Sequence, residues 1–147
     1  MPADADAAYG LVHALAAHEA SLTYLKITQE DFSAAAFGDN PSFRILIAEL
    51  DGKAVGIATY IERFHIWSGK TIIELDDLFV KKEARGHGIG TKLLKAVGAL
   101  AKEIQAPVKW QVNTDNTGAI KLYKSLGADY SERGICFWRP ENILKEE

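Results

Sequence analysis

The chain has 147 residues, of which 48% are hydrophobic and 25% charged, so it fits one globular domain over residues 1–147 rather than a disordered segment. Its net charge of −3 argues against a nucleic-acid-binding protein, which needs a clustered basic surface. A single cysteine, Cys136, excludes an internal disulfide, and its apolar neighbours predict a buried strand position.

The first half of the chain predicts two helices and three strands. Apolar residues at helical spacing predict a helix from Asp4 to Leu22, and Thr28 begins a capping pattern for a short helix that ends at Phe37. The expected strands are Phe43 to Leu50, Ala54 to Glu62 and Ile72 to Val80. Asp51-Gly52 between the first two strands predicts a tight hairpin.

The second half alternates helices and strands. We expect a helix from Thr91 to Gln105, whose buried stripe consists of Leu93, Val97, Leu100 and Ile104. A strand from Val108 to Val112 and a helix from Thr117 to Leu126, ended by Gly127, follow. The last expected strand runs from Ile135 to Trp138 and pairs with residues near Tyr130. Antiparallel strands followed by a strand–helix–strand unit indicate an α/β (α+β) fold with a mixed sheet.

A glycine-rich loop, Arg85-Gly86-His87-Gly88-Ile89-Gly90, joins a predicted strand to a predicted helix. Such a loop binds anions, because the first N–H groups of a helix have no partner within the helix and the helix dipole favours negative charge there. The Walker pattern is absent, and position 91 is threonine where a dinucleotide fingerprint needs glycine. The loop fits Arg-x-x-Gly-x-Gly.

Together with Leu78-Phe79-Val80 before it and Asn116, Ala119-Ile120, Leu122-Tyr123 and Leu126-Gly127-Ala128 after it, this loop resembles the acetyl-CoA core of the GNAT N-acetyltransferases. Further segments resemble the diamine (spermidine/spermine) N-acetyltransferase branch: Leu15 to Glu19, Leu25 through Thr28 to Phe32, Phe37-Gly38, Asp76-Asp77-Leu78-Phe79-Val80 and Tyr123-Lys124. The resemblance covers nearly the whole chain.

The resemblance implies a strongly bent mixed sheet with splayed central strands, flanked by about four helices. It also implies that acetyl-CoA lies between the splayed strands. The residues expected to bind it are Leu78, Phe79, Val80, Arg85, Gly86, His87, Gly88, Ile89, Gly90, Thr91, Asn116 and Ala119.

Three features depart from the family pattern. The usual first strand is missing before the first helix, so either that strand is absent or the natural start lies upstream. His65 stands where a loop aspartate is common near the tryptophan, here Trp67. Glu19 is followed by no further acids, whereas the branch often carries them. The last two departures weaken a polyamine assignment.

Acetyl transfer to an amine requires a base, because an alkyl ammonium with a pKa near ~10 must lose a proton before attack. Asp76 is the candidate base or ammonium partner, and Asp77 and Glu74 are the next candidates for this role. Strand alternation predicts that Asp76 and Glu74 point to one face of the sheet and that Asp77 points to the other. Tyr123 is the candidate acid for the leaving thiolate. Glu19, Trp67, Asp76 and Asp77 are the expected substrate contacts.

The resulting hypothesis is an acetyl-CoA-dependent N-acetyltransferase acting on a polyamine, a diamine or a lysine-like small molecule. The alternatives are a protein N-terminal or lysine acetyltransferase and a non-catalytic acetyl-CoA-binding regulatory module. We expect no metal, since His13, His18 and His65 have no metal-ligand spacing. We also expect no nucleic acid or membrane partner, a cytoplasmic location and, by resemblance, a homodimer.

Overall fold

The computed structural model describes residues 2–19 and 25–143. The chain forms two compact units, Met1–Trp110 and Gln111–Glu147, which are described separately below. None of the helices in the described ranges is long and apolar enough to cross a membrane. A single domain over the whole chain stays a prediction.

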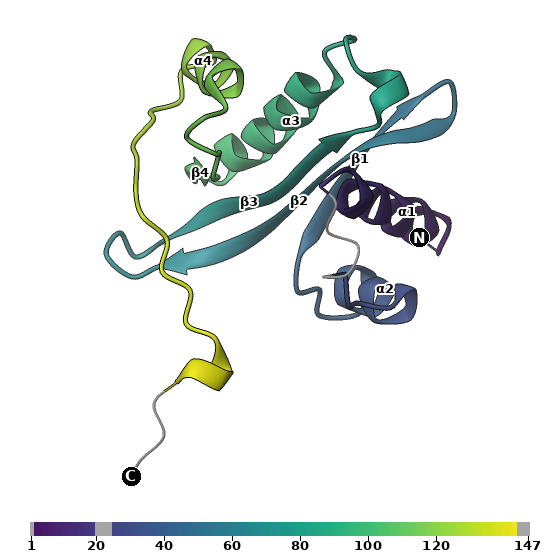
Figure 1. Ribbon diagram of the computed structural model, residues 1–147, viewed down its shortest axis with the longest axis horizontal. Helices are drawn as coiled ribbons and strands as arrows, with labels where there is room; N and C mark the ends of the chain where they lie inside the picture. The colour runs from purple at the N-terminus through teal and green to yellow at the C-terminus, as the bar shows by residue number, and fades with distance from the viewer. Residues whose placement is uncertain (1, 20–24, 144–147) are drawn as a thin grey trace. The chain divides into compact units, whose positions relative to one another are not determined.

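The first unit is built on a four-stranded sheet in the order β1-β2-β3-β4 (Figure 1). Its strands are β1 (Arg44–Leu50), β2 (Lys53–His65), β3 (Lys70–Val80) and β4 (Val108–Lys109). The pairs β1–β2 and β2–β3 are antiparallel, and β3–β4 is parallel. The expected mixed sheet is therefore confirmed, while a strong bend of this sheet stays a prediction.

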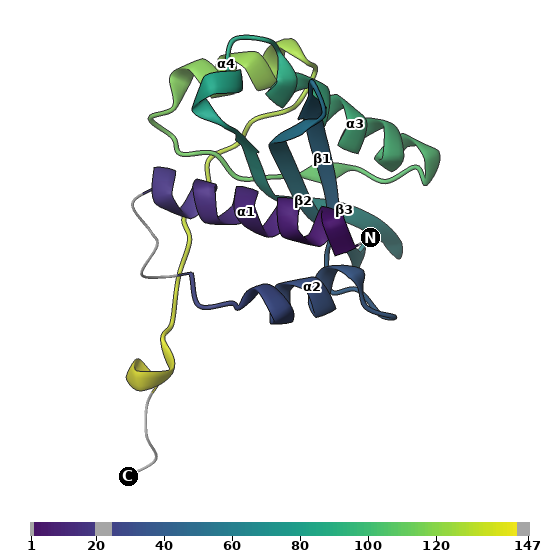
Figure 2. The ribbon, with the colours of Figure 1, turned by 90° about the vertical axis from the view of Figure 1, so that its right-hand side faces the viewer.

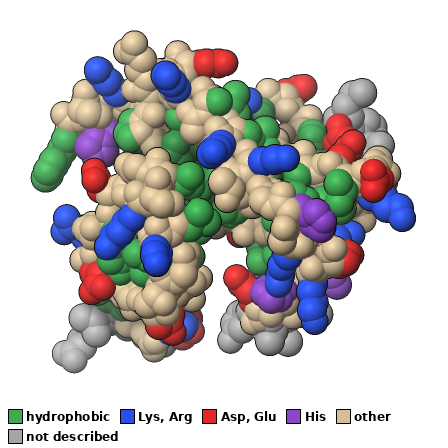
Figure 3. All heavy atoms as spheres, turned by 90° about the horizontal axis from the view of Figure 1, so that it is seen from above, with side chains coloured by type: hydrophobic (Ala, Val, Ile, Leu, Met, Phe, Trp, Pro, Cys, Tyr) green, Lys and Arg blue, Asp and Glu red, His purple; other side chains and the backbone are tan. Residues whose placement is uncertain are grey.

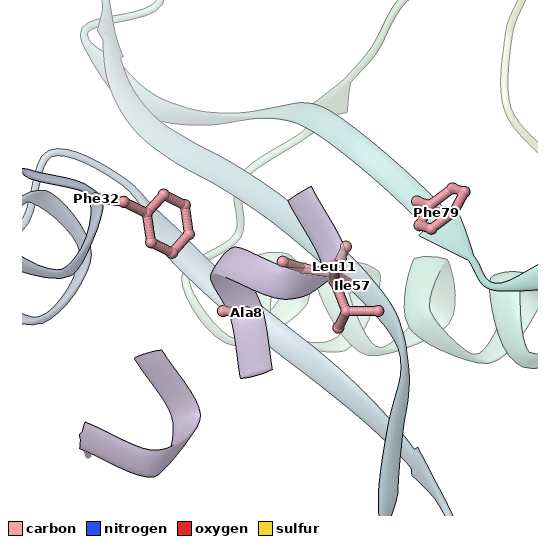
Figure 4. Close-up of a cluster of buried hydrophobic side chains, with 5 residues drawn as sticks. All are labelled: Ala8, Leu11, Phe32, Ile57 and Phe79. Atoms are coloured by element: carbon pink, nitrogen blue, oxygen red, sulfur yellow. The ribbon is translucent and has the colours of Figure 1, made fainter. Parts of the chain in front are cut away.

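Two helices cover one face of β1–β3 (Figure 2): α1 (Pro2–His18) and α2 (Gln29–Phe37). The Thr28 hydroxyl accepts the N–H of Asp31 at 3.1 Å, as the capping pattern predicts. A buried cluster of Ala8, Leu11, Phe32, Ile57 and Phe79 joins these helices to the strands (Figure 4). Leu22, expected at the end of the first helix, lies outside the described residues.

The helix α3 (Ile89–Glu103) lies on the opposite face of the sheet. Gly56 of β2 allows this close packing, since a Cβ there would lie 3.1 Å from Leu93 Cδ1 and 3.3 Å from Ile89 Cγ2. Neighbouring residues of a strand point to opposite faces, so Gly56 meets α3 while Ile57 meets α1.

Several boundaries differ from the sequence prediction. The helix α3 starts two residues early, inside the glycine loop, and its buried residues are Leu93, Leu94, Val97 and Ala101. Ile104 is half exposed because the helix ends before it. The strand expected at 108–112 is only two residues long, and β2 continues to His65.

The expected hairpin turn is confirmed, with Asp51 and Gly52 both left-handed at φ 52° and 76°. Among the described residues no strand precedes α1. Among the described strands, β1 lies at one edge of the sheet.

The second unit contains α4 (Thr117–Ser125) and the short 3-10 helix η3 (Pro140–Asn142). Gly127, with φ 94°, ends α4 in a Schellman turn: its N–H donates to Lys124 and the N–H of Ala128 donates to Tyr123.

The predicted strand Ile135–Trp138 is wrong, because these residues form no backbone ladder within the described chain. Ile135, Phe137 and Trp138 are exposed, and so is Cys136, which was expected in the core. Strand propensity alone does not form a strand when no neighbouring strand supplies its hydrogen bonds.

Candidate active site

The glycine loop follows β3 through a short 3-10 helix, η2 (Lys82–Ala84), and leads directly into α3. Gly86 and Gly88 are left-handed, with φ 84° and 73°, a conformation that a side chain strains. Gly88 is the N-cap of α3, and no side chain caps that end. Both glycines face open space, since a Cβ at either would meet no atom within 4 Å.

The N–H groups of Ile89, Gly90 and Thr91 form the first turn of α3. Within the described residues they donate to no acceptor; the first helical bond runs from Lys92 to the Gly88 carbonyl at 3.0 Å. Uncapped donors beside open space fit a diphosphate, which would also meet the positive end of the helix dipole. This arrangement is consistent with the predicted role of the loop.

Two side chains brace the loop from within. The Nε of Arg85 donates to the Val80 carbonyl at 2.9 Å, and its guanidinium lies 5.7 Å from the centre of the Phe79 ring. His87 Nδ1 lies 3.1 Å from the carbonyl oxygens of both Ala84 and Arg85, so that nitrogen carries the hydrogen. His87 is thereby engaged in holding the loop conformation.

One edge of β3 is open beside this loop. The strand β4 pairs with β3 only at Ile73 and Glu74. From Leu75 to Val80 no described strand pairs with that edge, although β2 pairs with the other edge along the same stretch. Backbone groups of Leu78, Phe79 and Val80 therefore lie on an unpaired strand edge, to which an amide-containing ligand could add.

The strand β3 carries a β-bulge at Asp76. Thr59 of β2 pairs with Asp77 and Tyr60 pairs with Leu75, so Asp76 is the extra residue. Bulges redirect side chains and commonly lie beside active sites. Here the bulge lies at the start of the open edge, and it interrupts the regular alternation of side chains between the two faces of the sheet at the exposed Asp76.

Two of the three acids near the bulge already have partners. Asp77 accepts the Thr59 hydroxyl at 2.5 Å, and Glu74 forms an ion pair with Arg63 at 2.8 Å. Asp76 makes no hydrogen bond or ion pair within the described chain. Partial desolvation by the surrounding protein, and then the charges of Asp77 and Glu74, raise the pKa of Asp76 above its usual value.

The bulge also overturns the predicted division of the acids between two faces. Asp77 lies opposite Thr59 and Glu74 opposite Ile61. Positions 59 and 61 are two residues apart on β2 and share a face. Glu74 and Asp77 therefore lie on the same face, because the extra residue reverses the alternation of β3.

Of the remaining expected substrate contacts, one lies near β3 and one does not. Glu19 directly follows His18, whose ring is 5.9 Å from the ring of Phe79, so the end of α1 approaches the bulged half of β3. Trp67 lies in the turn between β2 and β3, beyond the last residue pair of the two strands, and that pair is six residue pairs from Asp77. The first unit does not bring Trp67 and Asp76 together.

Three expected site residues belong to the second unit. Asn116 is the N-cap of α4, and its side-chain oxygen accepts the N–H of Ala119 at 3.3 Å. Tyr123 lies half-buried on the same helix. The roles of Asn116, Ala119 and Tyr123 stay predictions.

The sequence interpretation missed two residues that hold the acids, Thr59 and Arg63. The side chain of Thr59 is buried, with 4% of its surface exposed. The sequence signal for the role of Thr59 was its position within the apolar run from Val55 to Ile61, because a buried hydroxyl group needs a hydrogen-bond partner.

Comparison with known proteins gives a consistent picture. The model of the acetyltransferase (GNAT) family matches residues 11–128. Thialysine N-epsilon-acetyltransferase of Sus scrofa is 35% identical over 127 residues, which are 80% of this chain and 74% of that protein. Spermidine/spermine N(1)-acetyltransferase-like protein 1 of Homo sapiens is 36% identical over 126 residues, 80% of this chain and 18% of that protein.

Solved structures with low identity share the fold. An aminoglycoside acetyltransferase from an uncultured soil metagenomic sample superposes with a TM-score of 0.78 at 23% identity. The match covers 97% of this chain and 91% of that chain.

Proposed function

Since the chain belongs to the acetyltransferase (GNAT) family and is an enzyme of that family, we propose that it transfers the acetyl group of acetyl-CoA to a primary amine of a small molecule. The acceptors that we favour are a lysine-like amino acid and an alkyl diamine or polyamine. The names of its relatives, which include thialysine and spermidine/spermine acetyltransferases, support this choice. The observation that carries the proposal is the carboxylate of Asp76 at the bulge, which lies beside the open edge of β3 and has no partner among the described residues.

We assign acetyl-CoA binding to three parts of the chain. The N–H groups of Ile89, Gly90 and Thr91, with Arg85 and the glycines before them, are suited to the diphosphate. The open edge at Leu78 to Val80 is suited to the amides of the pantetheine arm. As the resemblance implies, we also assign Asn116 and Ala119 to the binding of acetyl-CoA. The bound thioester supplies the acetyl group.

Asp76 acts on the acceptor amine. An ammonium group near its carboxylate is stabilised by charge, and Asp77 and Glu74 add to the negative potential. A carboxylate with a raised pKa is also a stronger base, so it accepts the ammonium proton more readily, directly or through water. The neutral nitrogen then attacks the thioester carbonyl, and Tyr123 protonates the departing sulfur.

Asp77 and Glu74 serve a different purpose in this proposal. Their partners Thr59 and Arg63 hold them in place, so they act as fixed charges rather than as bases. The acceptor end of the site is thus negative, and Glu19 at the end of α1 adds a further carboxylate. We also propose that the protein is a homodimer, in keeping with the resemblance, and that it needs no metal.

A screen of amines with acetyl-CoA tests the proposal by following the release of free thiol. We expect release with lysine analogues or with diamines and polyamines, and none without an amine. Asp76→Asn should reduce kcat by about 10²-fold or more, the usual contribution of a general base. Glu62→Gln is the matched control, because Glu62 lies on β2 and pairs with Arg44 at 3.4 Å. Absence of release with every amine, including peptides, would rule out the proposed activity.

A further inference from the structure

The ion pair between Arg63 of β2 and Glu74 of β3 is accessible to ligands. The Nε of Arg63 lies 2.8 Å from Oε1 of Glu74, and the two side chains are 43% and 27% exposed. An ion pair with this exposure contributes little to the stability of a fold. Holding Glu74 engages the Nε of Arg63, and the terminal nitrogens of the guanidinium carry further N–H donors.

The register of β2 and β3 shows which way the Arg63 side chain leans. Arg63 lies opposite Ile72, whereas Glu74 lies opposite Ile61. To reach Glu74, the Arg63 side chain therefore leans along the sheet toward the bulge at Asp76. Its guanidinium lies at the level of Glu74, which precedes Asp76 by two strand residues, about 7 Å along β3.

This guanidinium lies on the same face of the sheet as Asp77. Thr59, Ile61 and Arg63 alternate along β2 and share a face, and Thr59 is the residue opposite Asp77. That face therefore carries the carboxylate of Asp77 and, nearer the β2–β3 turn, a guanidinium that leans toward it. The planar fork of N–H groups in a guanidinium fits a carboxylate.

Charge over the whole surface is a weak guide to the acceptor. The net charge is only −3, and on the face shown in Figure 3 Lys and Arg side chains are interspersed with Asp and Glu side chains. A mixed surface of this kind does not produce the strong field of one sign that steers a charged ligand. Discrimination between acceptors that share a primary amine therefore depends on local contacts.

We propose that Arg63 is a specificity-determining residue, whose guanidinium binds the carboxylate of an amino-acid acceptor while Asp76 binds the side-chain amine. This inference rests on the proposed function and chooses between its two acceptor classes. An extended lysine holds its side-chain nitrogen about 7 Å from its carboxylate, which matches the separation along β3. A diamine of that length would place a second ammonium beside the guanidinium, where like charges repel and Glu74 is already paired.

Two acceptors that differ in one group test this assignment. They are lysine and 1,5-diaminopentane, which is lysine without its carboxylate. The wild type should have the higher kcat/KM for lysine, with acetylation at the side-chain nitrogen. Arg63→Gln should lower kcat/KM for lysine by about 10- to 100-fold, mainly through KM, as expected for loss of a hydrogen bond between charged groups. It should raise kcat/KM for the diamine about two- to fivefold, because Glu74 becomes available to the second ammonium.

Arg44→Gln is the matched control. Arg44 also forms an exposed ion pair with a glutamate, at 3.4 Å from Glu62. It lies opposite Tyr60, and Tyr60 and Glu62 share the other face of the sheet. Arg44→Gln should therefore leave the preference for lysine unchanged. Arg63→Lys, which keeps the charge but loses the planar fork, should recover part of the activity on lysine. Thermal unfolding checks that each variant is folded.

Several results would overturn the inference while leaving the proposed function intact. These are a wild type that uses 1,5-diaminopentane as well as lysine, a wild type that acetylates other small amines but neither of these, an Arg63→Gln enzyme with unchanged kcat/KM for lysine, and one with unchanged preference between the two acceptors. A wild-type protein that acetylates no small amine would instead refute the proposed function, and the inference with it.

Discussion

A substitution at Gly90 can distinguish two reasons for glycine in the loop, which are the backbone conformation of the loop and the close approach of a bound ligand. Unlike Gly86 and Gly88, Gly90 is helical and has no positive φ. A Cβ at this position would meet only Val80 Cγ2, at 3.7 Å, which is ordinary van der Waals contact. The fold therefore does not need glycine at position 90, whereas a diphosphate that approaches the N–H of this residue does.

Gly90→Ala should accordingly stabilise the free protein and weaken acetyl-CoA binding. Replacing a glycine in a compatible conformation gains about 0.4–1 kcal/mol, chiefly by restricting the unfolded chain. For a chain of this size, this corresponds to a rise in Tm of about 1–4 °C. Loss of one hydrogen bond to a charged group, about 1.5–3 kcal/mol, should raise the Kd for acetyl-CoA by about 10- to 100-fold.

The assays are thermal unfolding without ligand and calorimetric titration with acetyl-CoA. Gly98→Ala is the matched control, because Gly98 lies on the same helix with no atom within 4 Å of its Cβ position. It should raise the Tm similarly and leave the Kd unchanged. Wild-type affinity in Gly90→Ala would refute the close approach of the ligand, and a lowered Tm would refute the reasoning about the backbone.

Three further predictions concern the sheet and the acids. Gly56→Ala should destabilise the protein by about 1–3 kcal/mol in chemical denaturation, because the new methyl group would crowd α3 and the Phe79 carbonyl, 3.3 Å away; an unchanged midpoint would contradict this packing. Because the pKa of Asp76 is raised in the folded protein, ionisation of Asp76 lowers the free energy of unfolding. This destabilisation is absent at pH values below the pKa of Asp76 in the unfolded chain and complete at pH values above its pKa in the folded protein. Asp76→Asn should therefore be more stable than the wild type at pH 7, by less than about 1 kcal/mol, and no more stable near pH 3, which denaturation at the two pH values checks. Tyr123→Phe should lower kcat without changing the KM for the amine, and full turnover would exclude Tyr123 as the acid.

The sequence alone determined the features that depend on short-range chemistry. The capping threonine, the Asp51-Gly52 turn and the glycine loop each specify a local conformation through one or two residues, and the structure contains all three. The order of elements likewise predicted a mixed sheet, because hairpin-linked strands pair antiparallel and a strand–helix–strand unit pairs parallel. The motifs around the loop identified the family.

Only the tertiary structure decided how the acids are divided among roles. Strand alternation placed Asp77 on the opposite face from Glu74, and the bulge at Asp76 reversed that arrangement. A bulge depends on the register between two strands, and the sequence of β3 alone does not indicate it. Thr59 and Arg63 then engage Asp77 and Glu74 from the neighbouring strand, which leaves Asp76 without a partner within the described residues.

The structure also revealed how far apart two expected substrate contacts lie. Asp76 and Trp67 are near neighbours in sequence and belong to one motif pattern, yet β3 separates them by about 20 Å. A sequence fixes which residues a strand carries, but distance in space follows from the extension of that strand. For this chain, the sequence identified the family and the candidate residues, and the fold decided which of those residues lie close together.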